Sequence, residues 1–386
     1  MHKVGCTSFQ VSLTVCRYWG KRDTTLILPT NSSLSVSLEH LRSTTTAAAD
    51  PSFEKDRLWL NGKEEQINGR TATCIANLKA LRKQIEDKDS VPLSDMYLHI
   101  ASFNNFPTAA GLASSASGFA ALVASIAQLY KLPATPSQLS LIARQGSGSA
   151  CRSLFGGFVA WQMGSLPSGE DSLAVQIASQ SHWPDMHALI CVVSDLKKAT
   201  SSTSGMQRTV ETSSLLQHRI DHVVPQRMKD IQDAILRKDF ETFAKITMAD
   251  SNQFHAVALD TEPPIFYMND VSRAIIALIV EYNRASGKLK AAYTFDAGPN
   301  AVIYTLAENV KDIAQLVIKY FPQQEQFNDV LGIGPIQPAV IPGFNENILK
   351  QFEVGAVKGL IHTCVGDGPR SLDTEHSLLK SDGYPL

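Results

Sequence analysis

The order of apolar and polar positions predicts a chain of mixed helices and strands. Apolar residues recur at helical spacing over seven segments: 71–85, 112–130, 137–145, 225–237, 239–249, 268–285 and 310–320. Alternation or short apolar runs predict strands over 25–29, 32–38, 96–102, 158–163, 188–194, 291–295, 301–306 and 357–365. Residues 1–16 are weakly patterned, residues 322–350 resemble a loop, and the polar tail from Gly366 is expected to fray.

Two local signals refine this pattern. Asn61-Gly62 predicts a tight hairpin turn between residues 59–60 and Lys63, because both turn positions tolerate positive φ. Residues 197–205 mix lysines, hydroxyls and a glycine, a composition that phosphate loops share with linkers. We place a domain boundary beside this segment, which gives regions 1–195 and 196–386, the second of them more helical.

Composition narrows the class of protein. The chain has 386 residues, of which 44% are hydrophobic and 19% charged, as in a globular protein with a sizeable core. The formal net charge of -2 predicts no binding to nucleic acid or to a membrane, and no apolar run is long enough to span a bilayer. The six cysteines are widely spaced, which predicts reduced thiols in the cytoplasm and neither a zinc site nor a disulfide framework.

The stretch from Asn104 to Tyr130 is the centre of the candidate chemistry. Small residues fill its first half between Gly111 and Gly118, so backbone N–H groups there can approach a ligand closely. A small-residue loop that opens a helix joins unpaired N–H groups to the positive end of the helix dipole, which suits phosphate. Tight packing of an Ala/Ser-rich helix explains the same pattern, and both interpretations stay open here.

Two charged residues stand at loops that could carry chemistry. A second small-residue loop, 146–157, holds one permanent cation, Arg152, which could grip a carboxylate or phosphate with two hydrogen bonds. Taken alone, a surface arginine is the commoner explanation. Asp296 follows a predicted strand and could be a general base held by rigid backbone, although by itself it is more often a turn former.

Residues 18–23, Tyr-Trp-Gly-Lys-Arg-Asp, combine two aromatic rings, a glycine and three charges. The rings could stack on a nucleotide base while Lys21 reaches a phosphate, but a solvated turn beside a core tryptophan fits equally well. Neither G-x-x-x-x-G-K-[ST] nor a complete G-x-G-x-x-G occurs, so the common NTPase loop and a dinucleotide fold are not indicated.

Four stretches together resemble the mevalonate diphosphate decarboxylase family of the GHMP kinase superfamily, in its eukaryotic, fungal form. They are 18–23, 106–115, 146–157 and 293–300, and the likeness runs from about Arg17 to Thr363. The resemblance implies a two-lobed α/β (α+β) fold of GHMP kinase type. Its N-terminal lobe would have a left-handed βαβ crossover and its C-terminal lobe would be ferredoxin-like, with the active site between them.

The resemblance also implies the reaction. ATP phosphorylates the 3-hydroxyl of (R)-5-diphosphomevalonate, after which phosphate and CO₂ leave and isopentenyl diphosphate and ADP are produced, with Mg²⁺ required. A tertiary hydroxyl is a poor leaving group, and its phosphorylation makes departure possible. The family further implies a cytoplasmic homodimer in isoprenoid and sterol synthesis, with small-molecule substrates and no nucleic acid or membrane as partner.

Site roles follow from the resemblance position by position. It makes Asp296 the group that orients or deprotonates the hydroxyl, Arg152 the clamp on the substrate carboxylate, and Ser115 the hydroxyl beside the transferring phosphoryl group. ATP phosphates would lie on Pro107, Ala109, Gly111, Leu112, Ala113, Ser114 and Ser115. The diphosphorylated substrate would contact Tyr18, Trp19, Gly20, Lys21, Arg70, Ser147, Gly148, Ser149, Ala150, Cys151, Arg152 and Thr203. No residue is assigned as a metal ligand.

The chain departs from the family where Asn-Ile-Ala-x-x-Lys normally precedes Tyr-Trp-Gly-Lys. Ser12 replaces the asparagine, and Arg17 replaces the lysine that reaches the reacting hydroxyl and phosphate. Arg17 keeps the charge with a different geometry, so we include it among the catalytic residues and expect reduced turnover. Two alternatives stay open. One is a GHMP-type small-molecule kinase on the same fold that transfers phosphate without decarboxylation. The other is a binding-only pseudoenzyme, suggested by residues 1–16, which do not match the family's first strand.

Overall fold

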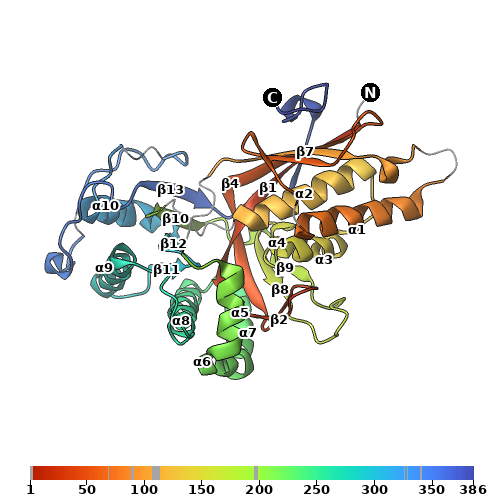
Figure 1. Cartoon of the computed structure of the whole chain (residues 1–386). Coiled ribbons are helices and arrows are strands. Elements are labelled where there is room, and N and C mark those ends of the chain that lie inside the picture. Colours follow the sequence, from red (N-terminus) through yellow and green to blue (C-terminus); the bar gives the residue numbers. More distant parts are fainter. Residues whose placement is uncertain are drawn as a thin grey trace.

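The computed structural model describes residues 3–67, 69–87, 91–106, 114–194, 199–325, 327, 329–339 and 341–386. These residues form two lobes, each with its own sheet and with helices packed against it (Figure 1). The mixed α/β class expected from the sequence is confirmed. No described helix is long and apolar enough to cross a membrane.

The first lobe is an eight-stranded sheet covered on one face by four helices (Figure 1). Its main path runs β14-β1-β4-β7-β5-β6, with β8 and β9 branching from β4. The strands are β1 (Lys3–Cys16), β4 (Ser33–Ala49), β5 (Arg57–Leu60), β6 (Lys63–Glu65), β7 (Leu98–Asn104), β8 (Phe158–Trp161), β9 (Ala174–Ala178) and β14 (Arg370–Leu372). The helices are α1 (Gly69–Ile85), α2 (Ser114–Tyr130), α3 (Pro136–Gly146) and α4 (Ala150–Ser153). A small separate sheet pairs β2 (Lys21–Asp23) with β3 (Leu28–Pro29).

The second lobe is built on a four-stranded antiparallel sheet in the order β11-β12-β10-β13. Its strands are β10 (Met186–Val192), β11 (Ala291–Phe295), β12 (Ala301–Leu306) and β13 (Gly359–Cys364). Helices α9 (Asp270–Ser286) and α10 (Val310–Tyr320) pack in one apolar core with this sheet. Helices α5 (Ser202–Thr212), α6 (Ser214–His218), α7 (Val224–Arg237) and α8 (Phe240–Leu259) lie toward the first lobe, with a π-helical turn at Arg219–Val223 (Figure 1).

The start of the chain is more regular than its pattern suggested. The weak pattern of residues 1–16 did not resemble the family's first strand, yet Lys3–Cys16 forms β1, a 14-residue strand paired with β4 and β14. It is sandwiched within the sheet and under α2, so its polar side chains are buried together with its apolar ones. Ser12 is 1% exposed and its hydroxyl lies 3.0 Å from the Ser37 hydroxyl of β4. Pairing of hydroxyl groups lets the polar positions of this strand be buried as well, so neither face of it is a solvated polar face.

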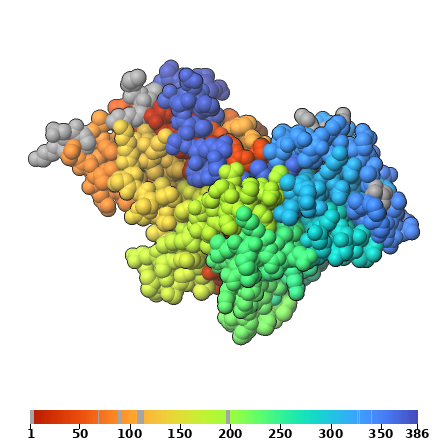
Figure 2. Space-filling model, turned by 180° about the vertical axis from the view of Figure 1, so that it is seen from behind, coloured from red at the N-terminus to blue at the C-terminus, as the bar shows by residue number. Residues whose placement is uncertain are grey.

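The division between the lobes does not follow the expected boundary at 195, because β10 lies before it and the C-terminal tail lies after it. Strand β10 precedes that boundary but pairs with β12 and β13 of the second sheet. The C-terminal tail returns to the first lobe, where Ser371 pairs with Thr7 and the Gly383 carbonyl accepts a hydrogen bond from His99 (2.8 Å). Expecting a frayed tail was therefore wrong, and Figure 2 shows the tail lying across the first lobe.

Other elements differ from the sequence prediction in type or in length. The segment expected as a hydroxyl-rich loop becomes helix α5 from Ser202, since Ser201 caps it by accepting from the Ser204 N–H. Strand 32–38 extends through Ala49 in β4, whereas strand 25–29 shortens to β3. The hairpin at residues 59–63 is confirmed, with Asn61 and Gly62 at φ 49° and 79°.

Candidate active site

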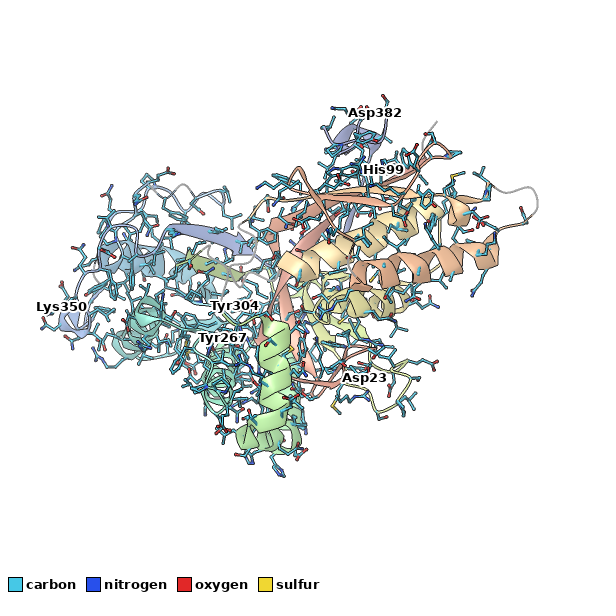
Figure 3. The ribbon with its side chains drawn as sticks, in the orientation of Figure 1. Asp23, His99, Tyr267, Tyr304, Lys350 and Asp382 are labelled. Carbon is cyan, nitrogen blue, oxygen red and sulfur yellow. The ribbon has the colours of Figure 1, made fainter. Side chains whose placement is uncertain are left out.

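A cavity of about 450 Å³ lies where the lobes meet. Tyr304 of β12 joins the lobes beside it by donating to the Leu13 carbonyl of β1 (3.2 Å), and Figure 3 shows this tyrosine between the two lobes. The described residues around the cavity are Thr14, Arg17, Tyr18, Trp19, Lys21, Arg70, Ser114, Ser115, Ser147, Gly148, Ser149, Arg152, Ser201, Ser202, Thr203, Met206 and Asp296.

Cations dominate the charge of this cavity. Its described lining includes Arg17, Lys21, Arg70 and Arg152 against one carboxylate, Asp296. Such an excess, enclosed between two lobes, attracts small anionic ligands more strongly than the same charges would on an open surface. The near-neutral chain therefore concentrates positive charge at one place.

Arg152 is buried in the cavity wall, at 1% exposure, although its sequence context alone favoured a surface position. It reaches back from α4 to three hydroxyls: Ser35 Oγ at 3.0 Å, Ser33 Oγ at 2.6 Å and Thr14 Oγ1 at 3.0 Å. These bonds use three of the five guanidinium N–H groups, and burial lowers the pKa of Arg152. Among the described residues no carboxylate pairs with it, so its charge is available to an anionic ligand.

Arg17 and Asp296 meet across the lobes. The Arg17 Nε atom lies 3.8 Å from Asp296 Oδ1, and Arg17 Nη1 donates to Thr294 Oγ1 at 2.7 Å. Arg17 is 3% exposed, and no described acceptor is within hydrogen-bonding distance of its buried Nε atom. Burial lowers the pKa of this guanidinium, while the Asp296 carboxylate opposes the shift. The pair thus forms a half-buried acid beside a cation at the end of β11.

Lys21 and Arg70 form a second positive region of the cavity. Burial and the nearby Arg70 guanidinium lower the pKa of the Lys21 ammonium to about 8. Arg70, at the start of α1, also donates to Thr203 Oγ1 of α5 (3.3 Å). Two cations brought together with a hydroxyl at a helix start suit a ligand with several negative oxygens.

Serine hydroxyls form a third part of the cavity. Ser115 Oγ of α2 lies 3.3 Å from Ser147 Oγ, which follows α3, and Ser114 opens α2 beside them. These residues surround the amino end of a 17-residue helix, where the positive end of the helix dipole favours phosphate. The predicted ATP-binding positions Pro107, Ala109, Gly111, Leu112 and Ala113 lie outside the described residues.

Among the predicted site residues that the structure describes, most come together in this cavity, but Gly20, Ala150 and Cys151 do not line it. Ala150 and Cys151 are fully buried within α4, and Gly20 supports the turn behind the lining residues. Gly20 has φ +106°, and a side-chain carbon there would lie 2.8 Å from Thr30 Oγ1. These residues shape the wall and do not face the ligand space.

Trp19 lines the cavity but is 2% exposed. Its indole N–H donates to Thr209 Oγ1 (2.9 Å), and its ring packs edge-on against Phe254 and Tyr267, which is labelled in Figure 3. The ring is therefore occupied by the protein core. Stacking of Trp19 on a nucleotide base, one of the two sequence interpretations, does not fit this position.

Four lining residues were not predicted as site residues: Thr14, Ser201, Ser202 and Met206. Ser201 and Ser202 lie in the hydroxyl-rich segment that the sequence singled out, so a signal for them existed. Met206 follows Thr203 by one helical turn of α5 and could have been found once that helix was recognised. Thr14 had no signal, because its role depends on pairing with Arg152 from 138 residues away.

Comparison with known proteins agrees with this geometry. Residues 10–174 match a family model for the diphosphomevalonate decarboxylase-like N-terminal domain, and residues 188–372 match one for the mevalonate 5-diphosphate decarboxylase C-terminal domain. A diphosphomevalonate decarboxylase of Ganoderma lucidum is 71% identical over 391 residues, covering 98% of each chain.

Solved structures give the same result. A crystal structure of mevalonate 5-diphosphate decarboxylase superposes with a TM-score of 0.87 at 49% identity, covering 100% of both chains. A structure of MDDEF in complex with MVAPP, AMPPCP and magnesium has a TM-score of 0.75 at 30% identity, covering 97% of this chain and 100% of that one. Both family models and the relatives span nearly the full length, and the chain belongs to the diphosphomevalonate decarboxylase family.

Proposed function

We propose that this cavity carries out the ATP-dependent decarboxylation of (R)-5-diphosphomevalonate to isopentenyl diphosphate, with release of ADP, phosphate and CO₂. One observation carries the proposal. Arg152 from the first lobe and Asp296 from the second face the same enclosed space, which Lys21 and Arg70 also enter. A substrate with a carboxylate, a tertiary hydroxyl and a diphosphate offers one group to each of these three regions.

Arg152 would hold the substrate carboxylate. Two of its N–H groups remain after it has bonded to three protein hydroxyls, and these suit the two oxygens of a carboxylate. Because the carboxylate becomes neutral CO₂, very tight binding would stabilise the ground state more than the transition state. Hydroxyl partners keep the guanidinium in place without adding a second negative charge.

Asp296 would orient the 3-hydroxyl and accept its proton as the phosphoryl group is transferred. Arg17, 3.8 Å away, supplies a positive charge beside the oxygen that gains the phosphoryl group. Ser115 and the N–H groups that open α2 would stabilise the charge on the phosphates during transfer. Chemistry is thus divided between the lobes, with the acid on one and most cations on the other.

The donor groups of the cavity fit a Mg²⁺ ion bound chiefly through phosphates. The described lining offers one carboxylate, Asp296, and several hydroxyls, including Ser115 and Ser147. In nucleotide sites Mg²⁺ keeps several waters and takes only one or two protein ligands, so a larger acidic cluster is not needed. When bound, the ion would neutralise phosphate charge as the phosphoryl group moves.

The test measures ADP and CO₂ together, using diphosphomevalonate labelled in its carboxyl carbon. We expect equal amounts of both products, and a loss of about 10²–10⁴-fold in turnover for Asp296→Asn, since a positioned base contributes that much. Substrate binding should persist in the variant. ADP without CO₂ would identify a kinase, and binding without ADP release would identify a pseudoenzyme.

A homodimeric state and a cytoplasmic location stay predictions from the family resemblance. The described surface gives no interface to argue from. Analytical ultracentrifugation of the purified chain, at the concentrations used for activity measurements, tests the homodimeric state.

A further inference from the structure

Arg17 lies just beyond the last residue of β1, where its main-chain groups leave the sheet. Its N–H donates to Asp250 Oδ2 of α8 at 2.8 Å. Its carbonyl accepts from Arg219 Nη2 at 2.8 Å and from Asn31 Nδ2 at 2.9 Å. Two side chains of the second lobe therefore hold both polar backbone groups of a residue that belongs to the first.

Asp250 and Arg219 are fully buried, and their carboxylate and guanidinium are 2.7 Å apart. Arg219 also donates from Nη1 to Gln253 Oε1 at 2.8 Å. Burying such a pair carries a large desolvation cost, so it contributes little net stability compared with an apolar pair of the same volume. The pair instead supplies directional hydrogen bonds to the main-chain N–H and carbonyl groups of Arg17.

The same helix also holds the strand that carries Asp296. Ser251, next to Asp250 on α8, accepts a hydrogen bond from the Phe295 N–H at 3.1 Å. Phe295 is the last residue of β11 and precedes Asp296. Two consecutive residues of α8 thus hold the backbone at Arg17 and the backbone beside Asp296.

We propose that Asp250 and Arg219 are positioning residues that set the Arg17 guanidinium against Asp296. They act through the backbone of Arg17 and touch no reacting atom. Arg219 sits in the π-helical turn between α6 and α7, a kind of turn that is frequent at functional sites. The proposal rests on the role of Arg17 in the proposed function.

Arg227 provides a matched control within the same network. Its Nη1 donates to Asp250 Oδ1 (3.2 Å) and to Gln253 Oε1 (2.8 Å), as Arg219 does. Arg227 has no hydrogen bond to Arg17, and its side chain is 19% exposed. A variant at Arg227 therefore perturbs the charge network while leaving the contact with the Arg17 carbonyl intact.

The experiment is a double-mutant cycle that combines Arg219→Lys with Arg17→Ala. Turnover is measured as ADP release at saturating substrates, together with KM for diphosphomevalonate and thermal unfolding of each protein. We expect Arg219→Lys alone to lower turnover about 10²-fold, because a displacement of about 1 Å at a reacting group has that effect. Its KM should change less than about threefold, since Lys21, Arg70 and Arg152 keep their contacts.

In the Arg17→Ala background, Arg219→Lys should lower the residual turnover less than about twofold, because its effect passes through the missing side chain. Arg227→Lys should change turnover less than about threefold in either background. Equal losses from Arg219→Lys in both backgrounds would overturn the proposal, as would unchanged turnover in folded Arg219→Lys protein. Full turnover in Arg17→Ala alone would instead contradict the role of Arg17.

If Arg219→Lys does not fold, Gln253→Met replaces it in the cycle. This variant keeps the side-chain volume but removes the amide oxygen that receives Arg219 Nη1. The same dependence on Arg17 is then expected, and its absence counts against the proposal.

Discussion

The buried arginines of this chain differ in what surrounds their charge. Arg144 donates to the carbonyls of Leu26, Gly169 and Ser172, and does not line the cavity. Arg152 instead bonds only to hydroxyls and faces the ligand space. The first is held by backbone alone, whereas the second keeps donors for a substrate. Burial alone therefore does not distinguish a structural arginine from a functional one in this chain. The difference lies in whether the buried guanidinium is bonded to main-chain carbonyls or to hydroxyls that leave N–H groups for a ligand.

Lys21 gives a pH dependence with a definite sign. Its pKa of about 8 means that the ammonium is charged below that pH and neutral above it. Because the charged form attracts the diphosphate, kcat/KM for diphosphomevalonate should fall as pH rises through about 8. In kcat the fall should move to higher pH, since a bound anion favours the charged form.

Lys21→Arg provides the comparison for that profile. Arginine stays charged throughout the range, so the fall near pH 8 should disappear from kcat/KM measured between about pH 6.5 and 9.5. The same fall in the variant would show that another group titrates. Some lowering of affinity at all pH values is expected from the altered shape.

At the scale of single residues, the sequence indicated many of the residues that line the cavity but few of the partners that hold them in place. Asp296 and Arg152 were recognisable through the motifs that contain them, and both line the cavity. Thr14 was not, because a threonine in a weakly patterned strand has no distinguishing neighbour in sequence. Partners of this kind depend on which distant strand lies beside them.

Elements with strong periodicity were predicted within a few residues. Helix α10 and strands β11 and β12 have the expected bounds, since each buries a clear apolar face. Strands β1 and β4 were underestimated because their serines and threonines are buried alongside apolar residues. Helix α5 was missed because its first turn has the composition of a loop.

The placement of α5 can be tested at Gly205. A side-chain carbon there would lie 2.5 Å from Tyr267 Oη and 3.1 Å from Trp19 Cζ2, both in buried residues. Gly205→Ala should therefore push α5 outward, together with Thr203 and Met206, and raise KM about tenfold. Overpacking should also lower the free energy of unfolding by about 1–3 kcal/mol.

Gly118→Ala is the matched control for a helix glycine. Apart from the backbone of α2 itself, no heavy atom of the described residues lies within 4 Å of a side-chain carbon at Gly118 of α2, so the change acts chiefly on helix propensity. This variant should gain about 0.5–1 kcal/mol of stability in denaturant unfolding. A Gly205→Ala protein with unaltered KM and stability would show that α5 is free to adjust.

Over the whole molecule, the division into lobes is less simple than a single boundary. Sheet pairing places β10 in the second lobe and β14 in the first. No composition change marks these crossings, so hydrophobic pattern alone could not reveal them. The sequence resemblance predicted two lobes with a site between them, and the position of the tail required the coordinates.

The tail should stabilise the first lobe without taking part in catalysis. Leu379 is 6% exposed and packs with Phe53 and Trp59, none of which lines the cavity. In Figure 3, His99 and Asp382 lie at the top of the molecule, away from Tyr267 and Tyr304. Deleting residues 373–386 should lower the free energy of unfolding by about 2–5 kcal/mol, as for loss of a large buried side chain. Turnover at low temperature should stay within about twofold of the intact chain.

Removal of Leu386 alone is the control, because that residue is 79% exposed. Its loss should leave the denaturant midpoint nearly unchanged. If the chain without residues 373–386 is as stable as the intact chain, the contacts described for the tail do not stabilise the first lobe. If that deletion abolishes turnover in folded protein, the tail contributes to the active site.

The return of β14 to the edge of β1 has a consequence for synthesis. A ribosome makes β1 first and β14 more than 350 residues later, so the edge partner of the first strand is the last named strand to emerge. Until then, the stretch Cys6–Ser8 of β1, which pairs with β14 in the folded chain, presents unpaired N–H and C=O groups to the crowded cell. Protection of the nascent chain by a chaperone would matter most at that edge.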